Sequence, residues 1–253
     1  MRSTLKGLMA FSILCSAAPA LAQDETSPPD ALTVSGSATV VTDYRFRGIS
    51  QSDKDFAVQG GVTLNHQSGV YVGVWGSSID DYVAAGADQE IDLIAGYKTE
   101  VSSGTTLDVG ATYYYYPGAE KILPGYDSDF VEVYGSLSHT FGPVTGKVLA
   151  AYAPKQSALS VGNGKEDNFY LAGDLSTGIP NTPVSLTAHV GHSFGPSYLT
   201  IGKEYTDWSL GATYTWKNLT AGVSYVDTNK TLTSYSGKNI AKAGVVGSIG
   251  VSF

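Results

Sequence analysis

Residues 32–47, LTVSGSATVVTDYRFR, alternate between two kinds of side chain along their whole length. Even positions hold apolar or small residues and end in Tyr44 and Phe46, whereas odd positions hold mostly hydroxyl residues and end in charged ones. This period of two is that of a β-strand. At about 3.3 Å per residue the strand would reach roughly 50 Å, whereas strands of soluble sheets usually have about five or six residues. Such a strand is typical of the wall of a membrane β-barrel, which is apolar outside and polar inside.

The same alternation recurs in eleven further segments. These cover residues 57–66, 70–77, 89–99, 106–116, 129–141, 144–152, 168–175, 184–192, 207–216, 219–227 and 243–253. The links between them alternate between short turns, such as 67–69 and 142–143, and longer polar segments, such as 48–56 and 153–167. Short periplasmic turns, longer outer loops and an even number of strands are typical of bacterial outer-membrane barrels. We therefore predict an all-β fold, a transmembrane antiparallel up-and-down β-barrel of about twelve strands, over residues 32–253.

Residues 1–22 have the features of an export signal. Arg2 and Lys6 form a positive n-region, an apolar core follows, and Ala20 and Ala22 form an A-x-A cleavage site. The apolar core is too short to span a bilayer, so we expect this signal peptide to be removed during Sec-type export. Cys15 is the only cysteine, so the mature chain has no disulfide.

Composition narrows the remaining classes. Residues 23–31 are acidic and proline-rich, and we expect them to form a periplasmic linker. The chain has 15 basic and 23 acidic residues, which argues against nucleic acid as a partner. No run after the leader approaches 18 apolar residues, so transmembrane helices are excluded.

A secreted, soluble β-sandwich or closed barrel would show the same alternation. The expected strand lengths argue against it, as do outward aromatic residues near the strand ends, where a membrane barrel carries its interfacial girdles. These aromatic residues are Tyr44, Tyr97, Tyr113, Tyr115, Trp208, Tyr214, Trp216 and Tyr225.

The last strand ends in an aromatic residue and carries apolar residues at alternate positions, among them Ile249, Val251 and Phe253. A sheet that crosses hydrocarbon leaves no open edge, so this strand must pair with the first one. Its pattern resembles the C-terminal signal by which bacterial outer-membrane barrels are recognised for assembly. We therefore expect the barrel-assembly machinery, outer-membrane lipid and lipopolysaccharide as partners.

The polar strand faces would bring charges of both signs to a similar height in the lumen. The candidates are Asp43, Arg45 and Arg47 from the first strand, with Glu90, Asp92 and Glu132 from the fourth and sixth. Arginines facing carboxylates would form a constriction whose transverse field sorts solutes by charge. Alternatively, these charges pair directly and plug or stiffen the barrel.

Four tyrosines also point inward by parity: Tyr114, Tyr116, Tyr134 and Tyr170. Their rings would either stack against sugars or fill space. No catalytic residue is assigned, because His66 and His139 sit at the inner strand ends and His192 lacks serine and carboxamide partners. We expect no metal and no cofactor, since carboxylates in exposed loops are usually solvated.

Four segments carry a family resemblance: residues 40–61, 68–80, 90–97 and 113–118. With the sequence DYRFRGISQS at 43–52 as their most specific part, they resemble the proteobacterial TorF family of porin-like proteins, earlier catalogued as the Gcw_chp family of unknown function. The resemblance implies an outer-membrane barrel that conducts small solutes, and it transfers no substrate and no catalytic residue.

These observations lead to a functional prediction. We expect an outer-membrane porin-like channel for passive diffusion of ions or small polar solutes through a charged, tyrosine-lined lumen. The alternative is a non-conducting structural or adhesive barrel that acts through its extracellular loops.

Overall fold

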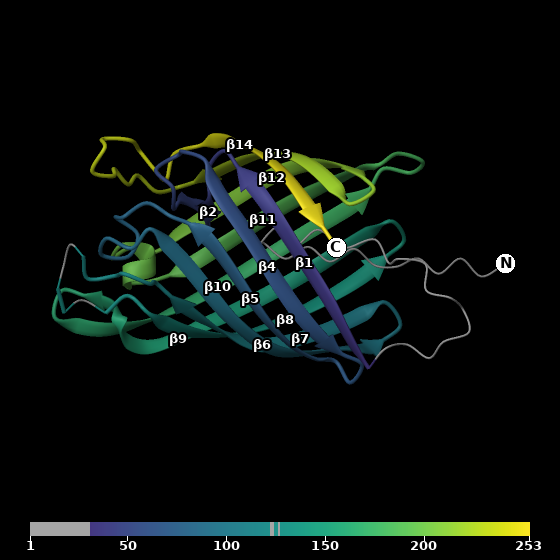
Figure 1. Cartoon of the computed structure of the whole chain (residues 1–253), viewed down its shortest axis with the longest axis horizontal. Helices are drawn as coiled ribbons and strands as arrows, with labels where there is room; N and C mark the ends of the chain where they lie inside the picture. The colour runs from purple at the N-terminus through teal and green to yellow at the C-terminus, as the bar shows by residue number, and fades with distance from the viewer. Residues whose placement is uncertain (1–30, 122–123, 126) are drawn as a thin grey trace.

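Twelve antiparallel strands close into one barrel in the computed structural model, which describes residues 31–121, 124–125 and 127–253 (Figure 1). The strands are β1 (Leu32–Val41), β4 (Ala57–His66), β5 (Val70–Ser78), β6 (Gln89–Ser102), β7 (Thr105–Tyr115), β8 (Phe130–Phe141), β9 (Val144–Val161), β10 (Gly164–Gly178), β11 (Val184–Phe194), β12 (Tyr205–Trp216), β13 (Leu219–Thr228) and β14 (Gly244–Ser252). The predicted fold class and strand number are confirmed. The expected signal peptide, with Ala20 and Ala22, lies outside the described residues.

Each barrel strand pairs with its neighbours in sequence, and β1 pairs with β14 to close the ring. That seam runs from Ser37 opposite Ser252 to Val41 opposite Ser248. Backbone hydrogen bonds of 2.9 and 3.0 Å between Gly36 and the last residue, Phe253, extend it. A Cβ atom at position 36 would lie 2.5 Å from the Phe253 ring, so glycine allows the last aromatic ring to cover the seam.

The outer surface of the barrel is apolar along its strands. Alternate residues of every strand expose aliphatic or aromatic side chains, such as Val58 (64%), Leu210 (63%) and Ile249 (61%). A continuous apolar belt of this kind is the surface that a transmembrane barrel presents to lipid. The predicted outward aromatic residues Tyr97, Tyr113, Tyr115, Tyr214, Trp216 and Tyr225 are exposed on it. Val251 and Phe253 are exposed there as well.

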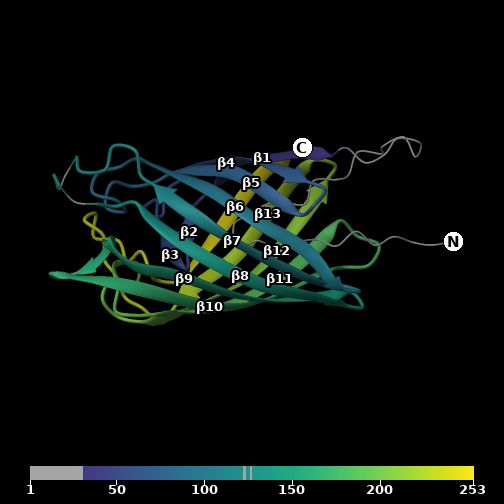
Figure 2. The same cartoon turned by 90° about the horizontal axis from the view of Figure 1, so that it is seen from below.

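Short turns lie at one end of the barrel and longer loops at the other, and the end with the longer loops is called the outer end below (Figure 2). Among the described residues, no helix is both long and apolar enough to cross a bilayer. The one described helical segment is a short 3-10 turn, η1 (Tyr198–Thr200), in the long-loop segment 195–204.

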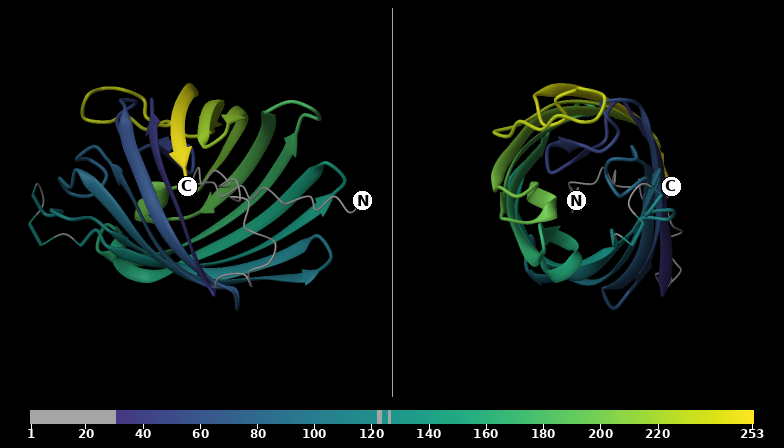
Figure 3. Two further views of the ribbon diagram at one scale, coloured as in Figure 1. Left: turned by 45° about the vertical axis from the view of Figure 1, so that its right-hand side comes forward. Right: turned by 90° about the vertical axis from the view of Figure 1, so that its left-hand side faces the viewer.

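Segment 42–56 departs from the predicted first strand. β1 ends at Val41, and the chain then folds into the lumen, where β2 (Arg45–Phe46) and β3 (Ile49–Ser50) form a small hairpin (Figure 3, right). The expected sixteen-residue strand is therefore wrong beyond Val41. So is the outward position of Tyr44, which is 9% exposed in the interior. Ten residues already suffice for a tilted strand to cross the hydrocarbon layer, about 9–11 being typical.

Residues 153–167 also differ from the prediction, which made them a long loop. β9 and β10 instead continue beyond the other strands as a hairpin closed by a tight turn at 162–163. Gly162, at φ +62°, supplies the left-handed conformation that this turn needs. The hairpin is irregular between residues 164 and 168, where the register shifts twice.

Candidate functional site

Arg47, at the tip of segment 42–56, crosses the lumen to the opposite wall. Its Nη2 lies 2.6 Å from Oε2 of Glu132 on β8, and its Nη1 donates to Oδ1 of Asn168 on β10 at 2.9 Å. The guanidinium also lies 4.8 Å from the ring centre of Phe46 and 4.2 Å from that of Tyr170. Strands β8 and β10 are far from β1 in the strand order, so this one side chain ties the inward segment to the far side of the barrel.

Arg45 makes a different set of contacts. Its Nε donates to Oδ2 of Asp43 at 2.7 Å, and Asp43 also accepts from Oγ of Ser50 at 2.6 Å. Its Nη1 donates to the carbonyl oxygens of Gly48, Ile240 and Lys242 at 2.9, 3.2 and 3.2 Å. Arg45 and Asp43 therefore shape segment 42–56 and fasten it to the outer loop 229–243, and they do not face the carboxylates of β6 and β8 as a separate wall.

Glu90 and Asp92 lie side by side on the inner face of β6, and both are almost fully buried. The hydroxyl of Tyr44 lies 3.2 and 3.3 Å from the two carboxylate oxygens of Glu90. Oδ1 of Asp92 has no hydrogen-bond partner. Within the described part of the chain, neither carboxylate takes part in an ion pair.

Aromatic rings fill the outer half of the lumen around these charges. Tyr114 stacks on Phe130 with ring centres 4.3 Å apart, and Phe46 meets the Tyr114 ring edge-on at 6.0 Å. Tyr44 packs edge-on against Trp75 at 5.6 Å. These rings belong to one apolar cluster that joins segment 42–56 to the barrel wall.

The other predicted lumen tyrosines make hydrogen bonds in the interior. The hydroxyl of Tyr170 lies 3.0 Å from Nε2 of His189 and 3.2 Å from both carboxylate oxygens of Asp207. Tyr134 shares a short hydrogen bond with Tyr71, whose hydroxyl donates to Asp108 at 2.7 Å. Tyr116, just past the end of β7, is buried beside the outer cavity described below.

A second charged cluster in the lumen was missed by the sequence analysis. His189 on β11 lies between two carboxylates, with Nδ1 2.6 Å from Asp174 and Nε2 3.0 Å from Asp207. Lys147 on β9 lies 3.3 Å from the same Asp174. Strand parity already places these side chains inward, so the signal was present in the sequence. The contacts depend on cross-strand register: Lys147 and His189 stand directly opposite Asp174 on its two neighbouring strands.

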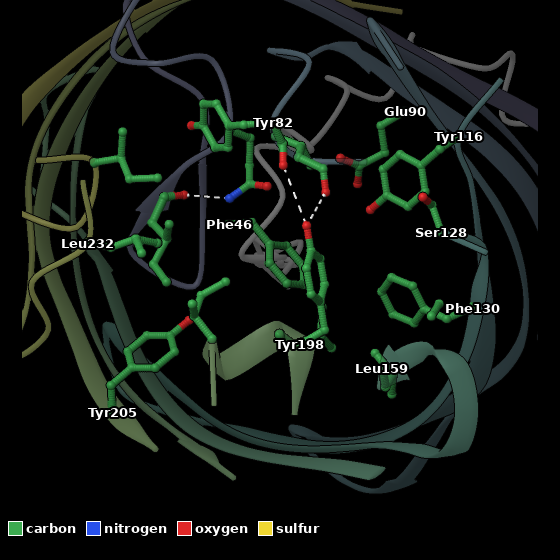
Figure 4. Close-up of a pocket in the computed structure, with 17 residues that line it drawn as sticks. Phe46, Tyr82, Glu90, Tyr116, Ser128, Phe130, Leu159, Tyr198, Tyr205 and Leu232 are labelled. Carbon is green, nitrogen blue, oxygen red and sulfur yellow. Dashed lines mark hydrogen bonds between the residues drawn. The ribbon is translucent and has the colours of Figure 1, made fainter. Parts of the chain in front are cut away.

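The outer end of the lumen contains a cavity between the loops and the upper strand ends (Figure 4). Its wall is mostly aromatic and aliphatic: Phe46, Tyr82, Tyr116, Phe130, Leu159, Tyr198, Tyr205 and Leu232 surround it in Figure 4. Glu90 and Ser128 add polar atoms on one side. The hydroxyl of Tyr198 donates to the carbonyl oxygen of Val83 at 3.1 Å, so the loops that line the cavity are also tied to each other.

Asp53 joins segment 42–56 to the outer loop 229–243. Its Oδ1 accepts from Oγ of Ser234 at 2.6 Å, and its Oδ2 lies 3.3 Å from Nζ of Lys238. Partial burial would raise the pKa of Asp53, but hydrogen bonds from Ser234, Ser236 and Lys238 outweigh it and lower the pKa below the ordinary 3.8. The segment is thus fixed at its outer side to loop 229–243 and at its inner side to β8 and β10.

The described residues hold no group of three or more histidine, cysteine, aspartate or glutamate side chains arranged to bind a metal ion.

Comparison with solved structures places this fold among outer-membrane porins. The NanC porin superposes with a TM-score of 0.60 at 12% identity, covering 87% of this chain and 99% of that one. The KdgM porin gives 0.57 at 8% identity, with 87% and 98% covered. An outer-membrane channel from Pseudomonas putida F1 gives 0.52 at 12% identity, with 90% and 99% covered. The chain therefore has the twelve-stranded fold of a porin.

The family follows from the sequence itself. Residues 23–253 match the model of Gcw_chp, described as a bacterial protein of unknown function, and the chain belongs to this family. Among curated proteins, no sequence matches it significantly.

Proposed function

We propose that this protein is a porin-like channel of the bacterial outer membrane through which ions or small polar solutes diffuse passively. Segment 42–56 narrows the lumen as a constriction loop, and solutes pass the charged and tyrosine-lined interior. The observation that carries the proposal is the bond of Arg47 to Glu132 and Asn168, which holds that loop across a closed, lipid-facing barrel. Charged residues at a narrow point of a pore set ion preference and limit solute size.

The charges at this constriction are unequal. Arg47 is paired with Glu132 and Arg45 with Asp43, whereas Glu90 and Asp92 have no basic partner among the described residues. With Glu90 and Asp92 ionised the balance is negative, so we propose that the channel prefers cations. The hydroxyls of Tyr44 and Tyr170 hydrogen-bond to carboxylates inside the lumen. Because these tyrosines are already held by interior contacts, we favour a space-filling role for them over stacking against sugars.

Export by a Sec-type signal and assembly through the last strand complete the proposal. Residues 1–22 serve as the leader, with cleavage after Ala22, and residues 23–31 form the linker before the barrel. Ile249, Val251 and Phe253 would present the outward apolar pattern to the barrel-assembly machinery, and the finished barrel would sit in outer-membrane lipid and lipopolysaccharide.

Planar-bilayer recording tests the channel. The refolded mature chain is expected to give discrete current steps, and a salt gradient is expected to give a reversal potential of the sign for cations. Arg45→Gln with Arg47→Gln would change both the conductance and the ion preference. Unchanged ion selectivity in this double variant would show that the two arginines do not set the selectivity of the constriction.

One observation favours a second function, a non-conducting barrel that acts through its outer loops. The outer half of the lumen holds a packed apolar cluster, and Arg45 and Arg47 each pair directly with a carboxylate. A barrel that is folded by its resistance to protease but silent at all voltages would support this function over the channel.

A further inference from the structure

The outer cavity combines an aromatic wall with a single charged group. Seventeen described residues line it, and Glu90 is the one acidic or basic residue among them (Figure 4). Tyr116 and Phe130 lie on the same side of the cavity as this carboxylate, and Phe46 lies nearer the middle of the view. An aromatic wall attracts cations through the negative faces of its rings, and it also accepts apolar groups.

The carboxylates behind this wall lack a balancing cation. Glu90 and Asp92 are 2% and 1% exposed, and the hydroxyl of Tyr44 is the one hydrogen-bond donor found for Glu90 in the described chain. Oδ1 of Asp92 and Oγ of Ser128 are buried without a partner, and Ser128 lines the cavity. A buried carboxylate without a counter-charge is costly, so a cation that reaches it gains a strong interaction in a region of low dielectric constant.

The two other acidic residues of the candidate site, Glu132 and Asp43, each have a basic partner. Arg47 neutralises Glu132, and Arg45 neutralises Asp43. Glu90, which lines the cavity, and Asp92 beside it on β6 have no such basic partner among the described residues. Their surroundings do not suit a hard divalent ion, which needs six or more oxygen ligands, because the neighbouring side chains are mostly rings and aliphatic groups.

We propose that the outer cavity binds small organic ammonium ions, with the ammonium group at Glu90, in front of the buried Asp92, and the apolar part against Phe46, Tyr116 and Phe130. The hydroxyl of Ser128 accepts a further ammonium hydrogen. Binding itself requires no conductance. The role of this site as the selective entrance of a pore rests on the function proposed above.

Isothermal titration of the folded, full-length mature barrel in detergent tests the binding site. The probe is 2-phenylethylammonium, and its neutral isostere 2-phenylethanol is the matched ligand control. We expect the ammonium ion to bind at least about tenfold more tightly than the alcohol, because charge-assisted hydrogen bonds and cation–π contacts act on the cation alone. Equal affinities, or no binding of either probe, would overturn the proposal.

Substitutions locate the site. Glu90→Gln is expected to weaken ammonium binding by about tenfold or more while leaving the alcohol unaffected, since an amide keeps the shape and loses the charge. Asp92→Asn gives the same test if the first variant does not fold. The control is Glu166→Gln, which removes a carboxylate that pairs with Lys155 at 3.8 Å on the β9–β10 hairpin and does not line the cavity. An equal loss in the control would place binding elsewhere.

Single-channel recording separates this inference from the channel proposal. Ammonium that binds in the titration and also blocks current from the loop side of the membrane supports both. If the barrel conducts, but the ammonium ion changes neither the current nor the titration heat, the binding site is overturned and the channel proposal is retained. A silent barrel that binds the ammonium ion supports the site and overturns the channel.

Discussion

Removal of the Arg47 guanidinium is expected to release segment 42–56 from the lumen. Arg47→Met takes away the ion pair of 2.6 Å with Glu132 and leaves that carboxylate buried, at 4% exposure, without a counter-charge. Breaking a buried pair on one side typically costs about 3–5 kcal/mol. The lost cation–π contacts with Phe46 and Tyr170 add about 2 kcal/mol each at buried sites.

A change of about 3 kcal/mol shifts the equilibrium between the docked and the released segment by roughly 150-fold. Hydrogen exchange of the amides in segment 42–56 and single-channel conductance measure this shift. Both are expected to rise in Arg47→Met, because a released segment is unprotected and no longer narrows the pore.

A double variant distinguishes the ion pair from a general loss of packing. Arg47→Met with Glu132→Leu removes both buried charges, and we expect it to recover most of the protection, since replacing both partners of a buried pair by apolar groups is often neutral. Lys155→Met is the control, because it breaks an exposed ion pair of 3.8 Å on the β9–β10 hairpin. Protection and conductance that stay at the original level in Arg47→Met would refute this reasoning.

Three further outcomes follow from the structure. Gly191→Ala would overlap the Tyr170 hydroxyl and break its hydrogen bonds, so we expect the free energy of unfolding in urea to fall by about 1–3 kcal/mol. Leu210→Arg puts a charge at the middle of the lipid-facing surface, at an expected cost of about 2–4 kcal/mol that lipid-vesicle refolding would detect. Because the pKa of Asp53 is lowered, we expect its contact with Lys238 to stay intact above pH 3.8 and to be lost as the pH falls through the lowered value. Carbon NMR of the Asp53 carboxyl group measures this pKa, and Lys238→Met should raise it.

The strands of the barrel were readable from the sequence because each satisfies a simple local rule. Inward and outward side chains alternate with period two, and lipid imposes apolar residues on one face of every strand. Residues 219–225 illustrate this, since their outward positions are aliphatic or aromatic and their inward ones small or polar. Pairing of the first and last strands followed from the absence of open edges in hydrocarbon.

The inward turn after Val41 was not predicted, because alternation continues through Asp43, Arg45 and Arg47 as if the strand went on. The thickness of the hydrocarbon layer indicates where the strand can end, because about ten residues already cross it. Arg47 and Gly48 take up positive φ angles of 47° and 80°, and this reverses the chain. Arg-Gly at 47–48, followed by the polar run to residue 55, marks such a turn in the sequence.

The sequence predicted which charged residues of the candidate site lie in the lumen, but not which residues they contact. Parity places Glu90, Asp92 and Glu132 in the lumen, and all three lie there. That Arg47 contacts Glu132 and Arg45 contacts Asp43 depends on the path of segment 42–56, which no local pattern specifies. The constriction role of these residues stays a prediction.

Single-channel recording of the mature barrel in a planar bilayer under a salt gradient tests the central claim most directly. The account predicts discrete conductance steps and a reversal potential of the sign for cations, because the proposed selectivity rests on ionised Glu90 and Asp92, which have no basic partner among the described residues. A folded, protease-resistant barrel that passes no current at any voltage would contradict it.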